Sequence, residues 1–197
     1  MQTKVRQTIL TTPRPYLSYS QLSVFERSQD SYIDIYINGN TYSNPRMDYG
    51  KRVHQSLETG LTSQEKSIQH AYTFLPRYGR PEAKIKVKTG DLTLYGILDD
   101  LNVRKSIINE YKTGAIIWTQ SRVNKDVQLT FYVLLFFLKY KRLPKIIYLN
   151  WLNTNQNSKD YLNITQFETH RTLTDIIRMD NRTKKVWQGI IKHCESI

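Results

Sequence analysis

The tripeptide Glu110-Tyr111-Lys112 carries the side chains most clearly able to do chemistry in this sequence. Residues two apart on a strand share a face, so a strand here would project the Glu110 carboxylate and the Lys112 ammonium group side by side. Asp99 closes the preceding apolar run, and a hairpin between the two runs would bring it next to Glu110. Two carboxylates beside an amine could bind a divalent metal ion with a positive charge next to it.

Two neighbouring strands must position these residues. Residues 92–101 and 106–112 are rich in β-branched and apolar side chains, and the second run ends at a Thr-Gly break, so we expect both to be strands joined by a hairpin turn. Asp99 and Asp100 are adjacent, so only one of them can face a metal ion from a strand. The Gly-x-x-Asp spacing assigns Asp99 to that position.

The chemistry that uses such a set is phosphodiester hydrolysis. Hard oxygen ligands hold Mg²⁺ or Mn²⁺, the metal acidifies a bound water and neutralises phosphate charge, and a lysine orients or stabilises the attacking group. Taken alone, an Asp followed by Glu-x-Lys also occurs by chance on the solvated face of a strand. Other segments of the chain must therefore decide between the two interpretations.

Those segments resemble the PD-(D/E)XK nucleases. Asp99 and Glu110-Tyr111-Lys112 match the family's Asp…(Asp/Glu)-x-Lys signature, and the Thr-Gly that follows resembles its RecB-like/Cas4-like branch. Three further stretches are similar to family segments and occur in the family's order: Ser18-Tyr19-Ser20-Gln21-Leu22, the Gly-x-x-His helix at 50–58, and the Gln-x-x-x-Tyr segment at 128–132. The resemblance spans roughly residues 18 to 150.

The resemblance implies a role for each matching residue. The implied metal ligands are three side chains and one backbone carbonyl: His54, Asp99, Glu110 and the carbonyl of Tyr111. Lys112 would orient or activate the water, and Gln128 and Tyr132 would help hold the nucleic acid. Glu82 is a secondary candidate, because some relatives carry an extra acidic residue before the metal aspartate; an ordinary surface glutamate at the start of a strand is the alternative.

The rest of the chain predicts the α/β fold of a PD-(D/E)XK (restriction-endonuclease-like) core, a mixed β-sheet flanked by helices. Besides the two strands above, apolar spacing predicts helices at 19–37, from Asp48, at 64–75, 128–140 and 172–194, and strands at 84–88, 145–152 and 161–167. In the closing helix, Leu173 and Ile177 are expected to face the core. We expect residues 1–17 to form a basic N-terminal arm and residues 18–197 a single nuclease domain.

The composition of the sequence limits which cofactors and partners are expected. The net charge of +12 favours a partner rich in phosphate, which we expect to be DNA, as single strands or duplex ends. Cys194 is the single cysteine, and one thiol cannot hold the iron–sulfur cluster of Cas4-like relatives, so we expect Mg²⁺ or Mn²⁺ and no such cluster. The sequence has no apolar run long enough to cross a bilayer, so we expect no membrane association and a cytoplasmic protein.

The leading functional hypothesis is a metal-dependent DNA nuclease, an exonuclease or an enzyme acting on single strands and ends, with roles in DNA repair, recombination or processing. Two alternatives stay open. One is a nucleic-acid-binding module on a nuclease fold whose catalysis has decayed. The other is an RNA-directed nuclease, because the predicted metal site does not distinguish the two sugars.

Overall fold

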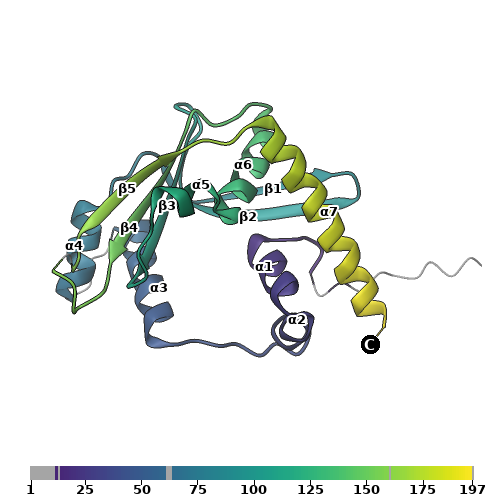
Figure 1. The fold of residues 1–197 in the computed structure, drawn as a ribbon, viewed down its shortest axis with the longest axis horizontal. Helices are drawn as coiled ribbons and strands as arrows, with labels where there is room; N and C mark the ends of the chain where they lie inside the picture. Colours follow the sequence, from purple (N-terminus) through teal and green to yellow (C-terminus); the bar gives the residue numbers. More distant parts are fainter. Residues whose placement is uncertain (1–11, 13, 61–63, 160, 197) are drawn as a thin grey trace, which may run out of the picture.

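One five-stranded sheet organises the protein, with its strands in the order β1-β2-β3-β4-β5 (Figure 1). The computed structural model describes residues 12, 14–60, 64–159 and 161–196. The strands are β1 (Arg80–Thr89), β2 (Leu92–Asn102), β3 (Ile107–Gly114), β4 (Ile146–Asn153) and β5 (Ile164–Thr169). The helices are α1 (Tyr19–Arg27), α2 (Gln29–Tyr36), α3 (Pro45–Thr59), α4 (Lys66–Phe74), α5 (Gln120–Asn124), α6 (Val127–Tyr140) and α7 (Leu173–Glu195).

The sheet is mixed, because β3 and β4 run parallel while the other neighbouring strands run antiparallel. Tyr111 and Leu152 pack with α3 and α4 on one face, whereas Leu149 and Trp151 belong to the cluster around α6. Side chains alternate between the faces of a strand, so helices cover both faces of the sheet. The predicted α/β fold, a mixed sheet flanked by helices, is confirmed.

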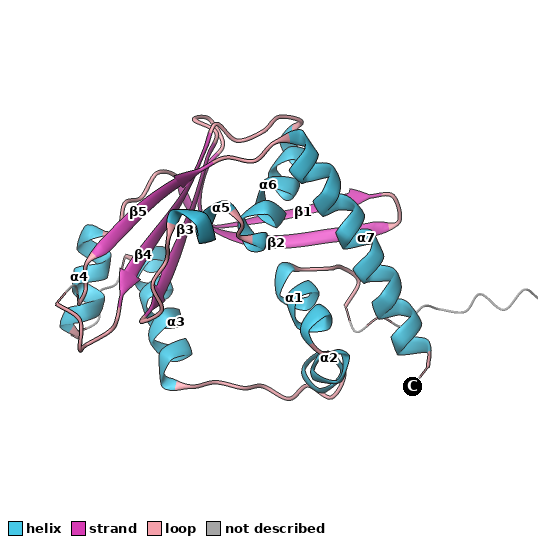
Figure 2. Ribbon diagram, in the orientation of Figure 1, coloured by secondary structure: helices cyan, strands magenta, loops and turns pink. Residues whose placement is uncertain are grey.

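The sheet opens into a fork between β2 and β3. Their ladder contains three residue pairs, of which Asp100 with Asn109 is the last before the strands separate. Near the start of β2, Leu17 takes the place of β3 beside the strand. Its N–H donates to the carbonyl of Thr93 at 2.8 Å, and its carbonyl accepts from the N–H of Tyr95 at 3.0 Å. Figure 2 shows β1 and β2 running across the direction of β3, β4 and β5. The base of the fork therefore lies just before Asp100.

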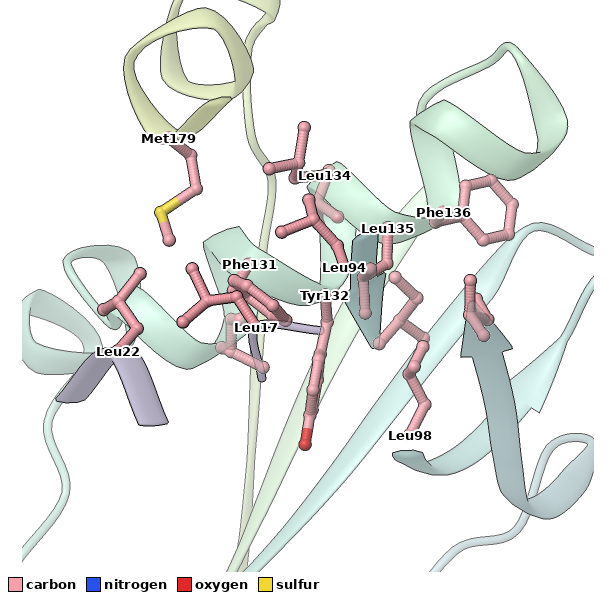
Figure 3. Close-up of a cluster of buried hydrophobic side chains, with 14 of the residues drawn as sticks. Leu17, Leu22, Leu94, Leu98, Phe131, Tyr132, Leu134, Leu135, Phe136 and Met179 are labelled. Atoms are coloured by element: carbon pink, nitrogen blue, oxygen red, sulfur yellow. The ribbon is translucent and has the colours of Figure 1, made fainter. Parts of the chain in front are cut away.

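Helix α6 forms the centre of the main core. Most of its residues are apolar, and all those from Phe131 to Phe136 are buried. Phe131 and Leu134 pack with side chains from the sheet, from the segment before α1 and from α7, including Leu17, Leu94 and Met179 (Figure 3). Gly96 allows this close packing, because a Cβ there would lie 2.4 Å from Leu135 Cδ1. The glycine of the Gly-x-x-Asp spacing thus lets β2 approach α6.

The prediction of one continuous helix at 19–37 is wrong, because Ser28 divides this segment into α1 and α2. Ser28 has extended backbone angles (φ −163°, ψ 119°); its N–H donates to the Val24 carbonyl at 2.9 Å, and its Oγ accepts from the N–H of Ser31 at 3.1 Å. One serine therefore ends the first helix and caps the second. Other boundaries differ by a few residues; for example, Asn44 caps α3 so that it starts at Pro45.

The predicted arm of residues 1–17 lies mostly outside the described residues. Its last residue, Leu17, is fully buried and is held by the two backbone hydrogen bonds to β2. Leu17 therefore belongs to the core, while the arm itself stays a prediction for residues 1–11 and 13.

Candidate active site

Strand β3 places a carboxylate and an amine in direct contact. Lys112 Nζ donates to Glu110 Oε1 at 2.6 Å and to Gln128 Oε1 at 2.6 Å. The amide of Gln128 in turn donates to the hydroxyl of Tyr132, one turn farther along α6, at 2.8 Å. Glu110, Lys112, Gln128 and Tyr132 thus form one hydrogen-bonded chain that joins β3 to α6.

Glu110 is almost fully buried, with an exposed fraction of 1%. Its second oxygen, Oε2, is buried and has no hydrogen-bond partner among the described residues. Burial and the neighbouring charge of Asp99 raise the pKa of Glu110 to about 8, against the opposing effect of Lys112. A buried carboxylate oxygen without a partner is costly, which makes this oxygen a candidate ligand for a metal ion.

Asp99 lies at the base of the fork. Where the β2–β3 ladder ends, Asp99 Oδ2 accepts a hydrogen bond of 2.8 Å from the backbone N–H of Tyr111. Asp100 points elsewhere, because its Oδ2 accepts from the backbone N–H of Tyr78 at 2.5 Å and from the amide of Asn109 at 3.2 Å. The two adjacent aspartates therefore have different surroundings, with Asp99 on the side of the β3 carboxylate and lysine.

Helix α3 brings an imidazole to Asp99. His54 Nδ1 lies 3.3 Å from Asp99 Oδ1 and 3.8 Å from Glu82 Oε1. The helix can approach β3 closely because residue 50 is glycine; a Cβ there would lie 3.1 Å from Thr113 Oγ1. His54 is thus held over the fork by the packing of α3 against the sheet.

Glu82 reaches this cluster from β1, through an unusual backbone. Its φ is +47°, a left-handed conformation that is uncommon for a residue other than glycine and that is enriched at functional sites. Potential ligand atoms of His54, Glu82 and Asp99 all lie within 4.8 Å of one another. Glu82 therefore lies beside the imidazole and Asp99, although the sequence predicted it only as a secondary candidate.

Opposite charges in this cluster stabilise one another and shift one another's pKa. Burial alone would lower the pKa of His54, but the charge and hydrogen bond of Asp99, with help from Glu82, raise it to about 10. Burial alone would raise the pKa of Asp99, but the His54 charge and hydrogen bond keep it below its usual value. Lys112 is also affected: its burial is outweighed by Glu110 and Asp99, which raise its pKa. At neutral pH the His54 imidazolium thus neutralises the Asp99 carboxylate, which a metal ion would otherwise bind.

The clustered side chains of His54, Glu82 and Asp99 fit a divalent metal ion, and Glu110 lies in the adjoining group. The unpartnered Oε2 of Glu110 and the carboxylate of Asp99 supply the hard oxygen atoms that Mg²⁺ and Mn²⁺ prefer, and imidazole is an accepted ligand of Mn²⁺ and related metals. His54 and Glu110 must lose their protons before they can bind a cation. The side chain of Tyr111 points away from the chain of Glu110 and Lys112, and its hydroxyl donates to the Pro76 carbonyl at 2.9 Å. Its backbone carbonyl stays a predicted ligand.

The structure therefore brings the predicted residues together in two adjoining groups. One contains His54, Asp99 and Glu82, and the other contains Glu110, Lys112, Gln128 and Tyr132. The local sequence gives little sign of how close Glu82 comes, because its contacts depend on the pairing of β1 with the Asp99 strand. Within the described residues, no helix is long and apolar enough to cross a membrane.

Among the comparisons with known proteins, only the solved structures bear on the fold. No family model and no curated protein matches the sequence. Among solved structures, a proposed exonuclease from Eubacterium rectale superposes with a TM-score of 0.65 and 10% identity, over 98% of this chain and 87% of that protein. The protein SSO0001 superposes with a TM-score of 0.52 and 14% identity, over 90% of this chain and 78% of its own. The chain is thus an α/β protein with a fold found in a proposed exonuclease.

Proposed function

We propose that this protein is a metal-dependent nuclease of the PD-(D/E)XK type, in the RecB-like/Cas4-like branch but without its iron–sulfur cluster, and that it hydrolyses phosphodiester bonds of DNA. The observation that carries the proposal is the state of Glu110. This buried carboxylate has one oxygen on Lys112 and the other without a partner among the described residues. The same strand end adjoins Asp99 and His54.

Each side chain has a role in that reaction. When bound, Mg²⁺ or Mn²⁺ would supply an acidified water and neutralise charge on the phosphate. Asp99, Glu110 and His54 would hold it, with Glu82 as a further ligand. Lys112 would orient the attacking group and stabilise negative charge near the phosphate, because it is fixed in place by Glu110 and Gln128.

The choice of a nucleic acid as substrate has two supports. The net charge of +12 favours a polyanion, and salt-dependent displacement of counterions would supply most of the binding. The fold is shared with a proposed exonuclease. Action on ends or single strands belongs to the proposal, as do the roles in DNA repair, recombination or processing.

A time course of cleavage tests this function. End-labelled linear DNA, closed circular DNA and an RNA of the same sequence are incubated with Mg²⁺, with Mn²⁺ and with a chelator. We expect metal-dependent cleavage of the linear DNA, slower or no cleavage of the circle, and none in chelator. Binding of all substrates without cleavage in either metal would favour the decayed binding module, and faster cleavage of RNA would favour the RNA-directed alternative.

A further inference from the structure

A pocket of about 270 Å³ adjoins the candidate active site. It lies between the segment before α1, strand β2 and helix α6. We name it the tyrosine pocket after the side chains that line it: Arg14, Tyr16, Tyr19, Tyr95, Gln128 and Tyr132. Pockets for drug-sized ligands have volumes of about 300–1,000 Å³, so this one suits a single planar ring system.

The tyrosine pocket is connected to the candidate catalytic lysine. Gln128 lines the pocket and accepts a hydrogen bond from Lys112 at 2.6 Å. Gln128 also donates to the hydroxyl of Tyr132 at 2.8 Å. Figure 3 shows this hydroxyl at the end of the ring that points away from Leu134 and Leu135. A ligand in the pocket would therefore lie one side chain away from the amine that contacts Glu110.

The aromatic wall of the pocket is fixed before any ligand binds. The rings of Tyr16 and Tyr95 lie 5.0 Å apart between centroids, at an interplanar angle of 55°. The buried side chain of Gln21 donates to the carbonyl of Tyr16 at 3.0 Å, and Leu17 bonds to the backbone of β2. A wall held in this way loses little conformational entropy when it binds a ligand.

The chemistry of the pocket suits a nucleobase. Tyrosine rings stack on any base, and an amide and a hydroxyl can hydrogen-bond to its edge. Arg14 adds a positive charge near the same wall; its guanidinium donates to the hydroxyl of Tyr16 at 3.4 Å and lies 5.2 Å from the ring centroid of Tyr36. Positive charge next to aromatic rings is the combination by which proteins hold single strands.

We propose that the tyrosine pocket binds one unpaired base of a single-stranded nucleic acid beside the metal site. This inference rests on the proposed nuclease function and specifies its substrate. A base inside a duplex is stacked and paired, so it could enter the pocket only after the cost of unstacking. The protein is therefore selective for single strands, or for the frayed end of a duplex, through base stacking as well as through charge.

Binding without cleavage tests the pocket directly. Single-stranded oligonucleotides that carry one abasic position, moved along the strand, are titrated against the full chain in chelator. We expect one position at which loss of the base weakens binding by about 5- to 100-fold, the range for one base–aromatic stack. A flat profile along the strand would overturn the inference.

Substitutions then locate the effect. Tyr95→Ala and Tyr16→Ala should each weaken single-strand binding by a similar factor and should remove the dependence on the abasic position, while duplex binding changes little. Tyr95→Phe keeps the ring and should keep the dependence on the abasic position. Tyr42→Ala is the matched control, because Tyr42 is 65% exposed on the connection between α2 and α3. Equal losses for single-stranded and duplex DNA would contradict a base pocket.

Failure of this inference differs from failure of the proposed function. Cleavage in Mn²⁺ with a flat abasic profile would keep the nuclease and remove the pocket. A position-specific profile without cleavage in either metal would keep the pocket and remove the nuclease. A free mononucleotide that binds as tightly as the oligonucleotide would overturn the assignment to single strands.

Discussion

Lys112 Nζ lies 2.6 Å from Glu110 Oε1, two residues away on the same face of β3. The contact keeps one oxygen of a buried carboxylate occupied and leaves the other without a partner among the described residues. Within β3, Lys112 is the residue whose charge lowers the pKa of Glu110 against the effect of burial. The catalytic proposal depends on this pair more than on any other.

Replacing Lys112 by Ala should lower the cleavage rate by about 10²- to 10⁴-fold, the usual contribution of a group that stabilises or transfers charge in the transition state. DNA binding should hardly change, because one positive charge is lost from a net +12. Lys86→Ala is the control, since Lys86 is exposed on β1. A folded Lys112→Ala protein that keeps more than about a tenth of the original rate would contradict the role.

The adjacent aspartates should respond differently to the same substitution. Asp99→Asn should lower cleavage by at least about 10²-fold, because it removes a metal ligand worth several kcal/mol to the transition state. Asp100→Asn should keep most of the activity, since an amide oxygen can still accept the hydrogen bonds from Tyr78 and Asn109. Cleavage assays and thermal melts of both variants test this.

Asp100→Ala provides a further comparison. It removes the acceptor of the Tyr78 N–H and one of the two acceptors of the Asn109 amide, and it should lower the free energy of unfolding by about 1–3 kcal/mol. The remaining folded protein should still cleave. Equal losses of activity in Asp99→Asn and Asp100→Asn would mean that the face of β2 at the site is assigned incorrectly.

The local sequence is sufficient to predict the hairpin of β2 and β3 and the separation of Asp99 from Asp100, because strand alternation and a turn determine both. It does not predict the extent of the fork, which depends on Leu17 replacing β3 beside β2. The tyrosine pocket follows from the same long-range contact. No spacing rule joins Tyr16 to Tyr95.

Two predictions from the sequence were wrong for physical reasons. Leu173, Ile176 and Ile177 of α7 were expected in the core; Ile176 is buried, as is Met179, but Leu173 and Ile177 are 53% and 62% exposed. Apolar residues occur on more than one side of the first turns of α7, and the packing of this helix against α6 and α1 determines which of them are buried. At Ser28 the capping signal was present, but the apolar spacing across it suggested a continuous helix.

Stability and metal binding should depend on pH in opposite directions. In the metal-free protein the pKa of Glu110 is raised from 4.5 to about 8 and that of His54 from 6.5 to about 10. A group whose folded pKa is raised stabilises the protein below its unfolded pKa, and this contribution is lost as the pH rises through the folded pKa. The melting temperature without metal should therefore fall as the pH rises, through Glu110 between pH 4.5 and about 8 and through His54 between pH 6.5 and about 10.

Metal binding should release these protons, so its affinity should increase over the same interval. Thermal melts with and without Mn²⁺ test both statements, because the increase in melting temperature caused by Mn²⁺ should grow with pH. His54→Ala should weaken Mn²⁺ binding and reduce the number of protons released, measured by calorimetry in buffers of different ionisation enthalpy. An increase in melting temperature that is the same at every pH would contradict the assigned ligands.

Glu82 allows backbone strain and ligand function to be separated. Its φ of +47° costs a residue with a Cβ about 1–2 kcal/mol relative to glycine. Glu82→Gly should therefore be more stable than Glu82→Ala by about 1 kcal/mol after the greater flexibility of unfolded glycine is subtracted. Both variants should lose Mn²⁺ affinity to the same extent. Denaturant unfolding and Mn²⁺ titration check this, and an unchanged affinity in both would remove Glu82 from the site.

The most direct test of the central claim is a titration of Mn²⁺ into the protein and its Glu110→Gln variant, followed by the electron paramagnetic resonance signal of free Mn²⁺ and, in parallel, by cleavage of end-labelled DNA. Gln is nearly the same shape as Glu but carries no charge, and Glu168→Gln on β5 is the matched control. We predict that Glu110→Gln loses tight Mn²⁺ binding and cleavage together, while Glu168→Gln keeps both. A folded Glu110→Gln protein that binds Mn²⁺ and cleaves DNA as the original protein does would contradict the account.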